Sequence, residues 1–281
     1  MGFAKGIDSP LKLASGGSLA ALEGRMTSGP GYPKIGRVVA LGASNLTRGF
    51  QTVVSSARAA WGPGVEVVAA IGHGRSYGAD SRFVVRRLPG ILQSGLWREL
   101  EAATPVPTRA LVTDVGNDIL YGFPPEQVLA WVDEALGRLG RFTDDIVLTD
   151  LPLASARNVS RLKFFAFKSV VVPACRLSLD QVLERAERVN AGLAELAEAR
   201  RARLFRLEPS WYGFDPIHIR PALWRTAWSE ILGVERAHGR SSAESVRLYL
   251  MRPERQWLFG VEQVTPQTGA GLPAGGHVWL Y

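Results

Sequence analysis

The sequence predicts an α/β protein, a three-layer α/β/α sandwich built around a parallel sheet. From residue 36 onward, short and nearly continuous apolar runs alternate with longer helical stretches. Strands that are buried on both faces have this apolar composition, and parallel strands need helices as the crossovers between them. In sheets of this kind, ligands bind beyond the carboxyl ends of the strands. The residues that follow each strand are therefore the first place to search for function.

The first two strands are marked by β-branched residues. Residues 37–42 form a short apolar run that ends in a glycine and leads into a helical pattern over about 45–61. Residues 65–71 form a second run, which ends in Gly72-His73-Gly74. Because the crossover between parallel strands is right-handed, the intervening helix is expected to cover one face of the sheet.

Three further strands repeat the pattern. Residues 109–115 run into Gly116-Asn117-Asp118, and residues 145–151 run into Pro152. Residues 203–207 follow a long amphipathic helix over about 179–201. The prediction is thus a sheet of five parallel strands.

The remaining segments have less regular patterns. Residues 152–177 are expected to be irregular and leave from the carboxyl end of a strand, so they either wall a pocket or form a loop packed by its own aromatic residues. A helix is expected over about 221–232. Runs at 246–250 and 256–261 suggest two strands about a turn at Pro253.

These patterns suggest three regions. Residues 1–25 lack a clear period and end just before Met26, which resembles an expression leader joined to a native start. Residues 26–235 form the main domain, and residues 236–281 form a small C-terminal β extension. The leader lacks the basic start and compact apolar block of a secretory signal, so the expected location is the cytoplasm.

Composition excludes several classes of protein. The 281 residues are 46% hydrophobic and 21% charged, as in a soluble globular protein, and no apolar run is long enough to span a membrane. The net charge of +7 comes from scattered arginines interleaved with acidic residues, which does not favour nucleic-acid binding. The single cysteine, Cys175, has apolar neighbours and is expected to be a buried, inert thiol. No Cys/His cluster has zinc spacing, so no metal is expected.

Chemically useful residues follow the strands in order. Ser44, Gly74 and Asn117 follow the first three strands, and Asp215-Pro216-Ile217-His218 follows the fifth. Each has an ordinary structural alternative: a helix N-cap for Ser44, a turn for Gly74, an Asx-turn or cap for Asn117, and a plain loop for the Asp-x-x-His run.

Together these residues supply the parts that acyl transfer requires. A carboxylate three residues before a histidine can hold the imidazole, whose other nitrogen can take the proton of Ser44. The backbone N–H groups of Ser44 and Gly74 and the side chain of Asn117 can donate hydrogen bonds to an oxyanion. A serine hydrolase with Ser44, His218 and Asp215 as its triad is therefore the leading hypothesis.

This order of residues resembles the SGNH (GDSL-type) hydrolase superfamily over roughly residues 36–235. Ser44 matches the nucleophile of that family, Gly74 the glycine donor with Gly72 as an alternative, Asn117 the asparagine donor, and Asp215 with His218 the closing pair. The resemblance implies a flavodoxin-like fold, carboxylic ester hydrolysis and no organic cofactor. It also implies small-molecule esters as substrates, among them lipids, acylated carbohydrates, thioesters and aryl esters.

The motifs depart from the family pattern at three positions. Ala43 stands where the first block has Asp, Asn45 where Leu is usual, and Val115 where the Gly-x-Asn-Asp block begins with Gly. No reacting group is lost. A catalytically weak relative that binds a ligand in the same cleft is the second hypothesis.

A second serine motif competes with Ser44. Gly74-Arg75-Ser76-Tyr77-Gly78 matches the Gly-x-Ser-x-Gly site of α/β-hydrolases and also follows a strand. Only two strands precede it, no His-Gly-Gly oxyanion stretch comes before it, and it leaves Ser44 and Asn117 unused. Side chains beside the motifs that could contact substrate are Asn45, Arg48, Arg75 and Tyr121.

Overall fold

The computed structural model describes residues 36–281 except 173–174, 236–241 and 273–274. The segment interpreted as a leader, residues 1–25, lies outside the described residues. The described residues form one compact unit.

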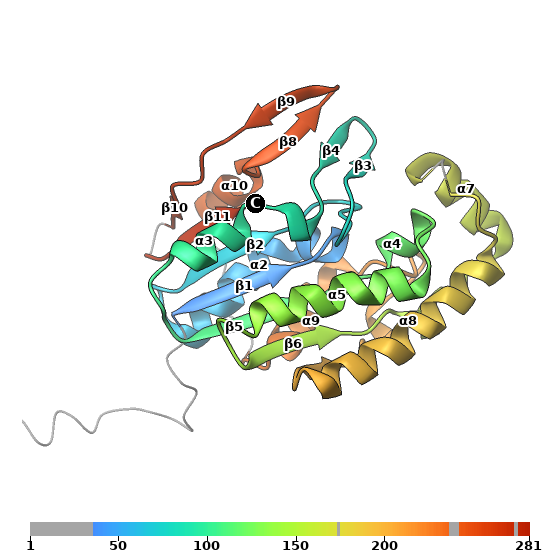
Figure 1. Ribbon diagram of the computed structural model, residues 1–281, viewed down its shortest axis with the longest axis horizontal. Helices are drawn as coiled ribbons and strands as arrows, with labels where there is room; N and C mark the ends of the chain where they lie inside the picture. The colour runs from blue at the N-terminus through green and yellow to red at the C-terminus, as the bar shows by residue number, and fades with distance from the viewer. Residues whose placement is uncertain (1–35, 173–174, 236–241, 273–274) are drawn as a thin grey trace, which may run out of the picture. The chain divides into compact units, whose positions relative to one another are not determined.

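A seven-stranded sheet lies at the centre of this unit, in the order β10-β11-β2-β1-β5-β6-β7 (Figure 1). Every neighbouring pair is parallel except β10 with β11. The strands, in chain order, are β1 (Arg37–Leu41), β2 (Glu66–Ala70), β5 (Thr108–Val112), β6 (Asp145–Thr149), β7 (Arg203–Phe205), β10 (Ala270–Gly271) and β11 (His277–Leu280). The α/β class and the five expected strands are therefore confirmed, and two further strands come from the C-terminal segment.

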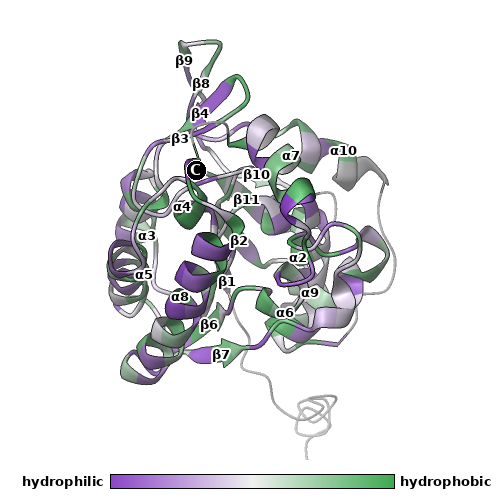
Figure 2. Cartoon of the chain, turned by 90° about the vertical axis from the view of Figure 1, so that its right-hand side faces the viewer, coloured by the Kyte–Doolittle hydropathy of each residue, from purple (hydrophilic) through white to green (hydrophobic). Residues whose placement is uncertain are grey.

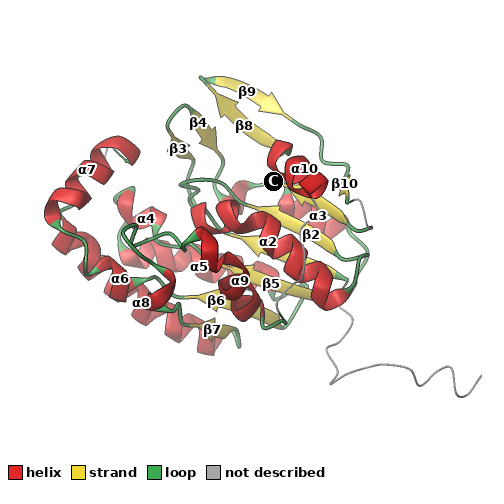
Figure 3. Cartoon of the chain, turned by 180° about the vertical axis from the view of Figure 1, so that it is seen from behind, coloured by secondary structure: helices red, strands yellow, loops and turns green. Residues whose placement is uncertain are grey.

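Helices cover both faces of the sheet, as the near-continuous apolar strands require. Alternate residues of β1 pack on opposite sides, with Val38 and Ala40 in one core and Val39 and Leu41 in the other. One layer contains α3 (Leu96–Ala102), α5 (Pro125–Leu139) and α8 (Leu179–Ala199). The other contains α2 (Ser44–Trp61), α9 (Trp224–Leu232) and α10 (Ser242–Leu250), as Figure 3 shows from behind.

Local sequence explains where the long helices begin and how they pack. A capping box formed by Ser178 and Gln181 starts α8. Figure 2 shows hydrophilic and hydrophobic residues mixed along α8, whereas β1 and β6 are mostly hydrophobic. Helices α2 and α9 cross closely at Gly49, where an added Cβ would lie 1.9 Å from Trp228 Nε1. Trp228 is fully buried and belongs to the core.

Residues 152–177, expected to be irregular, contain two helices. These are α6 (Leu153–Ala156) and α7 (Arg161–Val171), and the hydroxyl of Ser160 caps α7 by accepting a hydrogen bond from Lys163 N–H. The clustered aromatic residues obscured the helical period. Cys175, in the connection to α8, is buried and free, as expected.

The strand expected at 246–250 is wrong, because these residues end α10. Apolar residues at 246, 248 and 250 imitate strand alternation, but only Leu248 is buried. The run at 256–261 is a hairpin of β8 (Arg255–Leu258) and β9 (Val261–Val264), and its turn at Phe259-Gly260 has two positive φ angles. This hairpin joins β3 (Ser81–Phe83) and β4 (Arg86–Leu88) in a second, four-stranded sheet.

Two further short helices complete the elements near the site. Helix α4 (Asn117–Leu120) follows β5, and a 3-10 turn at Pro221–Leu223 precedes α9. No described helix is long and apolar enough to cross a lipid bilayer.

Candidate active site

Ser44 is the first residue of α2, directly beyond the carboxyl end of β1. The first backbone hydrogen bond of the helix runs from Thr47 N–H to Ala43 O at 2.8 Å. The N–H groups of residues 43–46 therefore have no partner within the helix. The N–H donors of this first turn and the helix dipole favour negative charge beside Ser44.

The carboxylate of Asp114 caps this helix from a different strand. Its Oδ2 accepts hydrogen bonds from Ala43 N–H and Leu46 N–H, each at 3.0 Å. The N–H of Ser44 is not among the donors that Asp114 caps and, as a first-turn group, has no intrahelical acceptor. Asp114 has φ 59°, a conformation that is uncommon for a residue other than glycine, and such strain concentrates at functional sites. Sequence analysis included Asp114 in the third strand and missed this role.

Asn45 links the nucleophile helix to the histidine loop. Its Nδ2 donates to Asp114 Oδ1 and to Ile217 O, both at 2.9 Å, and its Oδ1 accepts from Ile219 N–H at 2.8 Å. The two loop residues that it holds are the immediate neighbours of His218. Both amide donors of Asn45 are thus engaged by the protein, so the side chain positions the loop rather than offering its donors to a substrate.

The structure brings Ser44, His218 and Asp215 into one hydrogen-bonded row. Ser44 Oγ lies 3.0 Å from His218 Nε2, and Asp215 Oδ2 lies 2.7 Å from His218 Nδ1. These distances lie within the range required of a serine and its general base. Ser44 and His218 are 174 positions apart in sequence. They meet because β1 and β7 end at the same edge of the sheet, and the loop after β7 carries His218.

The surroundings of Asp215 favour its charged form. Burial alone raises the pKa of this carboxyl, but the His218 ring, the Ile217 N–H and the Arg48 guanidinium together outweigh burial and lower it. Arg48, one turn after Ser44, lies 3.7 Å from Asp215 Oδ2. An ionised Asp215 can orient the imidazole and stabilise an imidazolium.

Asn117 and Gly74 lie beyond the neighbouring strands. Asn117 is the first residue of α4 and lines the same cavity as Ser44. Gly74 follows β2 with φ 65°, and Tyr121 Oη donates to its carbonyl oxygen. An added Cβ on Gly74 would lie 2.8 Å from that hydroxyl. Tyr121, predicted as a substrate contact, is thus engaged with the Gly74 backbone.

His73, beside Gly74, was not singled out from the sequence. Burial lowers its pKa to about 4, with smaller contributions from the charges of Arg86, Arg48 and His218. Its ring stacks on Phe83 of β3, with centroids 5.4 Å apart. A neutral, stacked ring here fixes the loop that carries Gly74.

The competing serine is not accessible. Ser76 is fully buried, and its Oγ accepts hydrogen bonds from Gly78 N–H at 3.2 Å and Ala79 N–H at 2.9 Å. Ser76 therefore acts as a turn-forming residue. The prediction that Arg75 contacts substrate is also wrong, because its fully buried guanidinium donates to the carbonyl oxygens of Ile71, Pro89 and Tyr281.

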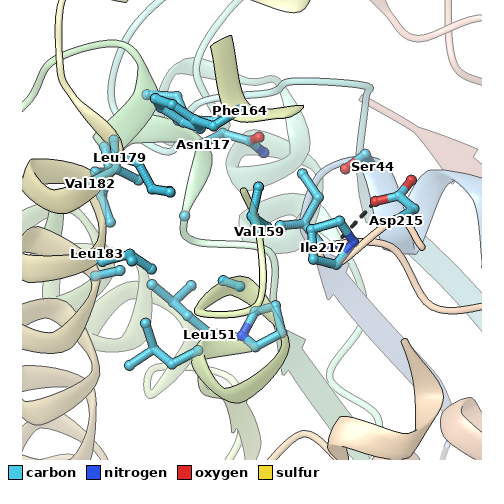
Figure 4. A pocket seen from close by; sticks show the side chains of 18 of the residues that line it. Ser44, Asn117, Leu151, Val159, Phe164, Leu179, Val182, Leu183, Asp215 and Ile217 are labelled. Carbon is cyan, nitrogen blue, oxygen red and sulfur yellow. Dashed lines mark hydrogen bonds between the residues drawn. The ribbon is translucent and has the colours of Figure 1, made fainter. Parts of the chain in front are cut away.

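A cavity of about 580 Å³ opens beside Ser44 (Figure 4). Ser44 and Asp215 line it at one side, Leu179, Val182 and Leu183 of α8 line the opposite side, and Asn117 lies between them beside Phe164. The segment 152–166 supplies a third wall, which includes Val159 and Phe164. Of the two interpretations of this segment, the structure therefore supports the pocket wall.

Comparison with known proteins finds similar folds but no close relative. No protein-family model matches the chain, and no curated protein matches it. Similar solved structures include the esterase EstA from Pseudoalteromonas sp. (13% identity, TM-score 0.45, covering 71% of this chain and 96% of that one). They also include a lipolytic G-D-S-L family protein from Veillonella parvula and the aryl esterase of M. smegmatis. Both are 13% identical and cover 70% of this chain and 97% of their own, with TM-scores of 0.46 and 0.47.

Among the described residues, no group of His, Cys, Asp and Glu side chains could hold a metal ion.

Proposed function

We propose that this protein is a serine hydrolase that cleaves carboxylic esters through an acyl-enzyme. One observation carries the proposal: the hydrogen-bonded row Ser44–His218–Asp215, with Ser44 at the wall of a cavity. A row of this kind converts a weakly nucleophilic hydroxyl into an effective nucleophile. The Asp114 cap and the Asn45 bridge support it, because they fix the start of α2 and the loop around His218 relative to each other.

In the first half-reaction, His218 Nε2 takes the proton of Ser44 Oγ while that oxygen bonds to the acyl carbon. The carbonyl π electrons move to oxygen, and the resulting oxyanion accepts hydrogen bonds from Ser44 N–H, Gly74 N–H and the Asn117 amide. When the carbon–oxygen bond to the alcohol breaks, His218 returns its proton to the leaving alkoxide. Ionised Asp215 stabilises the imidazolium between these two transfers.

In the second half-reaction, water replaces the alcohol. His218 removes a proton from water as the hydroxide oxygen attacks the ester carbon of acyl-Ser44. The same donors hold the second oxyanion, and protonated His218 supplies the proton that releases Ser44. The products are one carboxylic acid and one alcohol.

The test compares two serine variants on p-nitrophenyl butyrate. Ser44→Ala is expected to abolish turnover above background, whereas Ser76→Ala retains it, because Ser76 is buried in a turn. Circular dichroism and thermal melting verify that both variants fold. Loss of the Ser76 hydroxyl is expected to cost about 1 kcal/mol per hydrogen bond, without removing the reaction.

The opposite pattern, an active Ser44→Ala and an inactive Ser76→Ala, would establish the Gly-x-Ser-x-Gly mechanism instead. If the wild-type protein binds esters but does not hydrolyse them, the second hypothesis, a catalytically weak relative that binds a ligand, is supported. Covalent labelling by a fluorophosphonate, located by mass spectrometry, provides a second readout, because only an activated serine reacts.

A further inference from the structure

The cavity beside Ser44 has a composition that narrows the class of ester. Its walls come mainly from leucine, isoleucine, valine, alanine and phenylalanine side chains of α4, α6, α7 and α8. The volume of about 580 Å³ lies in the range of small-molecule binding sites. Such a lining binds an apolar group by removing its surface from water.

Asn45 and the three aspartates of the lining already have protein partners, whereas the Asn117 amide and the Lys163 ammonium make no side-chain hydrogen bond among the described residues. Asp114 accepts from the cap of α2, and Asn45 is engaged by the histidine loop. Asp150 accepts a hydrogen bond from Leu207 N–H at 2.8 Å. A sugar ring placed here would leave several of its hydroxyls without partners, at a cost for each one. The lining therefore disfavours an acylated carbohydrate whose sugar enters the cavity.

The position of the reacting groups decides which half of the ester enters. His218 must reach the leaving oxygen with its Nε2. Ser44 and Asn117 line the cavity, and so do Asp215, Pro216 and Ile217 of the histidine loop, but His218 itself does not. The alcohol therefore departs on the His218 side, while the carbonyl carbon sits at Ser44. The group continuing from that carbon into the cavity is the acyl chain.

We infer that the substrates of this protein are esters of medium- or long-chain fatty acids, whose acyl chain occupies the cavity between Ser44 and α8. This inference rests on the proposed function and adds the substrate class to it. Each methylene buried in the cavity is expected to raise kcat/KM by about two- to fourfold, since burial of one methylene contributes on the order of RT.

Two isomeric esters test the orientation. Ethyl octanoate and octyl acetate have the same atoms and nearly the same apolar surface, but the long chain lies on opposite sides of the ester bond. Hydrolysis is followed by pH-stat titration, with ethyl acetate as the short reference. We expect kcat/KM for ethyl octanoate to exceed that for octyl acetate and for ethyl acetate by at least tenfold.

A matched pair of variants on α6 tests the location. Ala156 lines the cavity, whereas Ala154 is exposed and does not. Ala156→Phe is expected to lower the octanoate-to-acetate ratio of kcat/KM for the ethyl esters at least tenfold, and Ala154→Phe to leave that ratio unchanged. Leu183→Ala, which enlarges the far wall, is expected to move the preferred acyl chain to a longer one.

The outcomes separate the two proposals. If none of the three esters is hydrolysed, the proposed function fails and the inference falls with it. If ethyl acetate is hydrolysed as fast as ethyl octanoate, and Ala156→Phe does not change the ratio, only the acyl-chain inference is overturned. If octyl acetate is preferred and is the ester affected by Ala156→Phe, the cavity binds the alcohol instead, and the inference is also wrong.

Discussion

Replacement of Asn45 by alanine probes the link between the nucleophile helix and the histidine loop. The change removes three hydrogen bonds, two donated by Nδ2 to Asp114 and Ile217 and one accepted by Oδ1 from Ile219. At about 1 kcal/mol for each neutral bond and somewhat more for the bond to the carboxylate, the loss sums to about 3–4 kcal/mol. Ile219 is buried, so its N–H cannot turn to solvent for a replacement partner.

The same change is expected to lower kcat more than it raises KM. With the bridge removed, the backbone on both sides of His218 is free to shift, and a displacement of about 1 Å at a reacting group can cost about 10² in rate. The walls of the cavity remain, so ground-state binding of the ester is largely kept. Urea denaturation measures the free energy of unfolding, and initial rates on p-nitrophenyl butyrate measure kcat and KM.

Two further variants sharpen the test. Asn45→Asp preserves size and the acceptor for Ile219, but it loses both donors and brings a second carboxylate against Asp114, so it should be no more active than Asn45→Ala. Asn158→Ala is the control, because Asn158 is exposed and its amide makes one bond, to Ala154 O. If Asn45→Ala loses less than about 1 kcal/mol and keeps kcat within twofold, the positioning role is refuted.

Three other perturbations follow from the structure. Asn117→Ala should lower kcat by about 10²–10³ with a smaller change in KM, because its amide acts on charge that develops in the transition state; a large rise in KM at unchanged kcat would instead indicate ground-state binding. Burial raises the pKa of Asp118 to about 6 from the ordinary value of 3.8, and Ser76 and Tyr77 only partly oppose the shift. The folded state therefore holds this proton more tightly, so stability relative to Asp118→Asn should be greatest below about pH 4. It should fall by about 3 kcal/mol as pH rises to about 6, and a difference in urea stability that does not change with pH would contradict this. Gly49→Ala should cost about 1–3 kcal/mol by forcing α2 away from Trp228, whereas Gly64→Ala, with no atom within 4 Å of the added Cβ, should change the melting temperature little.

The strands and the reacting residues could be predicted because both have local signals. Each of the five core strands is an apolar run that ends in a turn, and the polar residues after these runs must gather at one edge of a parallel sheet. This is why the sequence alone pairs Ser44 with His218 across 174 positions.

The supporting residues could not be predicted because their roles depend on tertiary contacts. Asp114 looks like the last residue of a strand, and only its positive φ turns the carboxylate toward the start of α2. Asn45 looks like an ordinary first-turn residue of a helix. The Gly-x-Ser-x-Gly pattern around Ser76 suggested a nucleophile where the structure has a buried turn residue, since a local motif contains no information about burial.

The placement of β11 has a consequence for how the chain folds. Its partner β2 precedes it by about two hundred residues, with His277 opposite Glu66, yet β11 is parallel to β2 and separates it from β10. During synthesis, one edge of β2 therefore stays uncovered while the remaining core strands are already available to pair. An uncovered apolar strand edge can pair with other chains, and contacts this distant in sequence form slowly. Aggregation is thus most favoured in the interval before residues 277–280 pair with β2. Chaperones that shield strand edges would act during this interval.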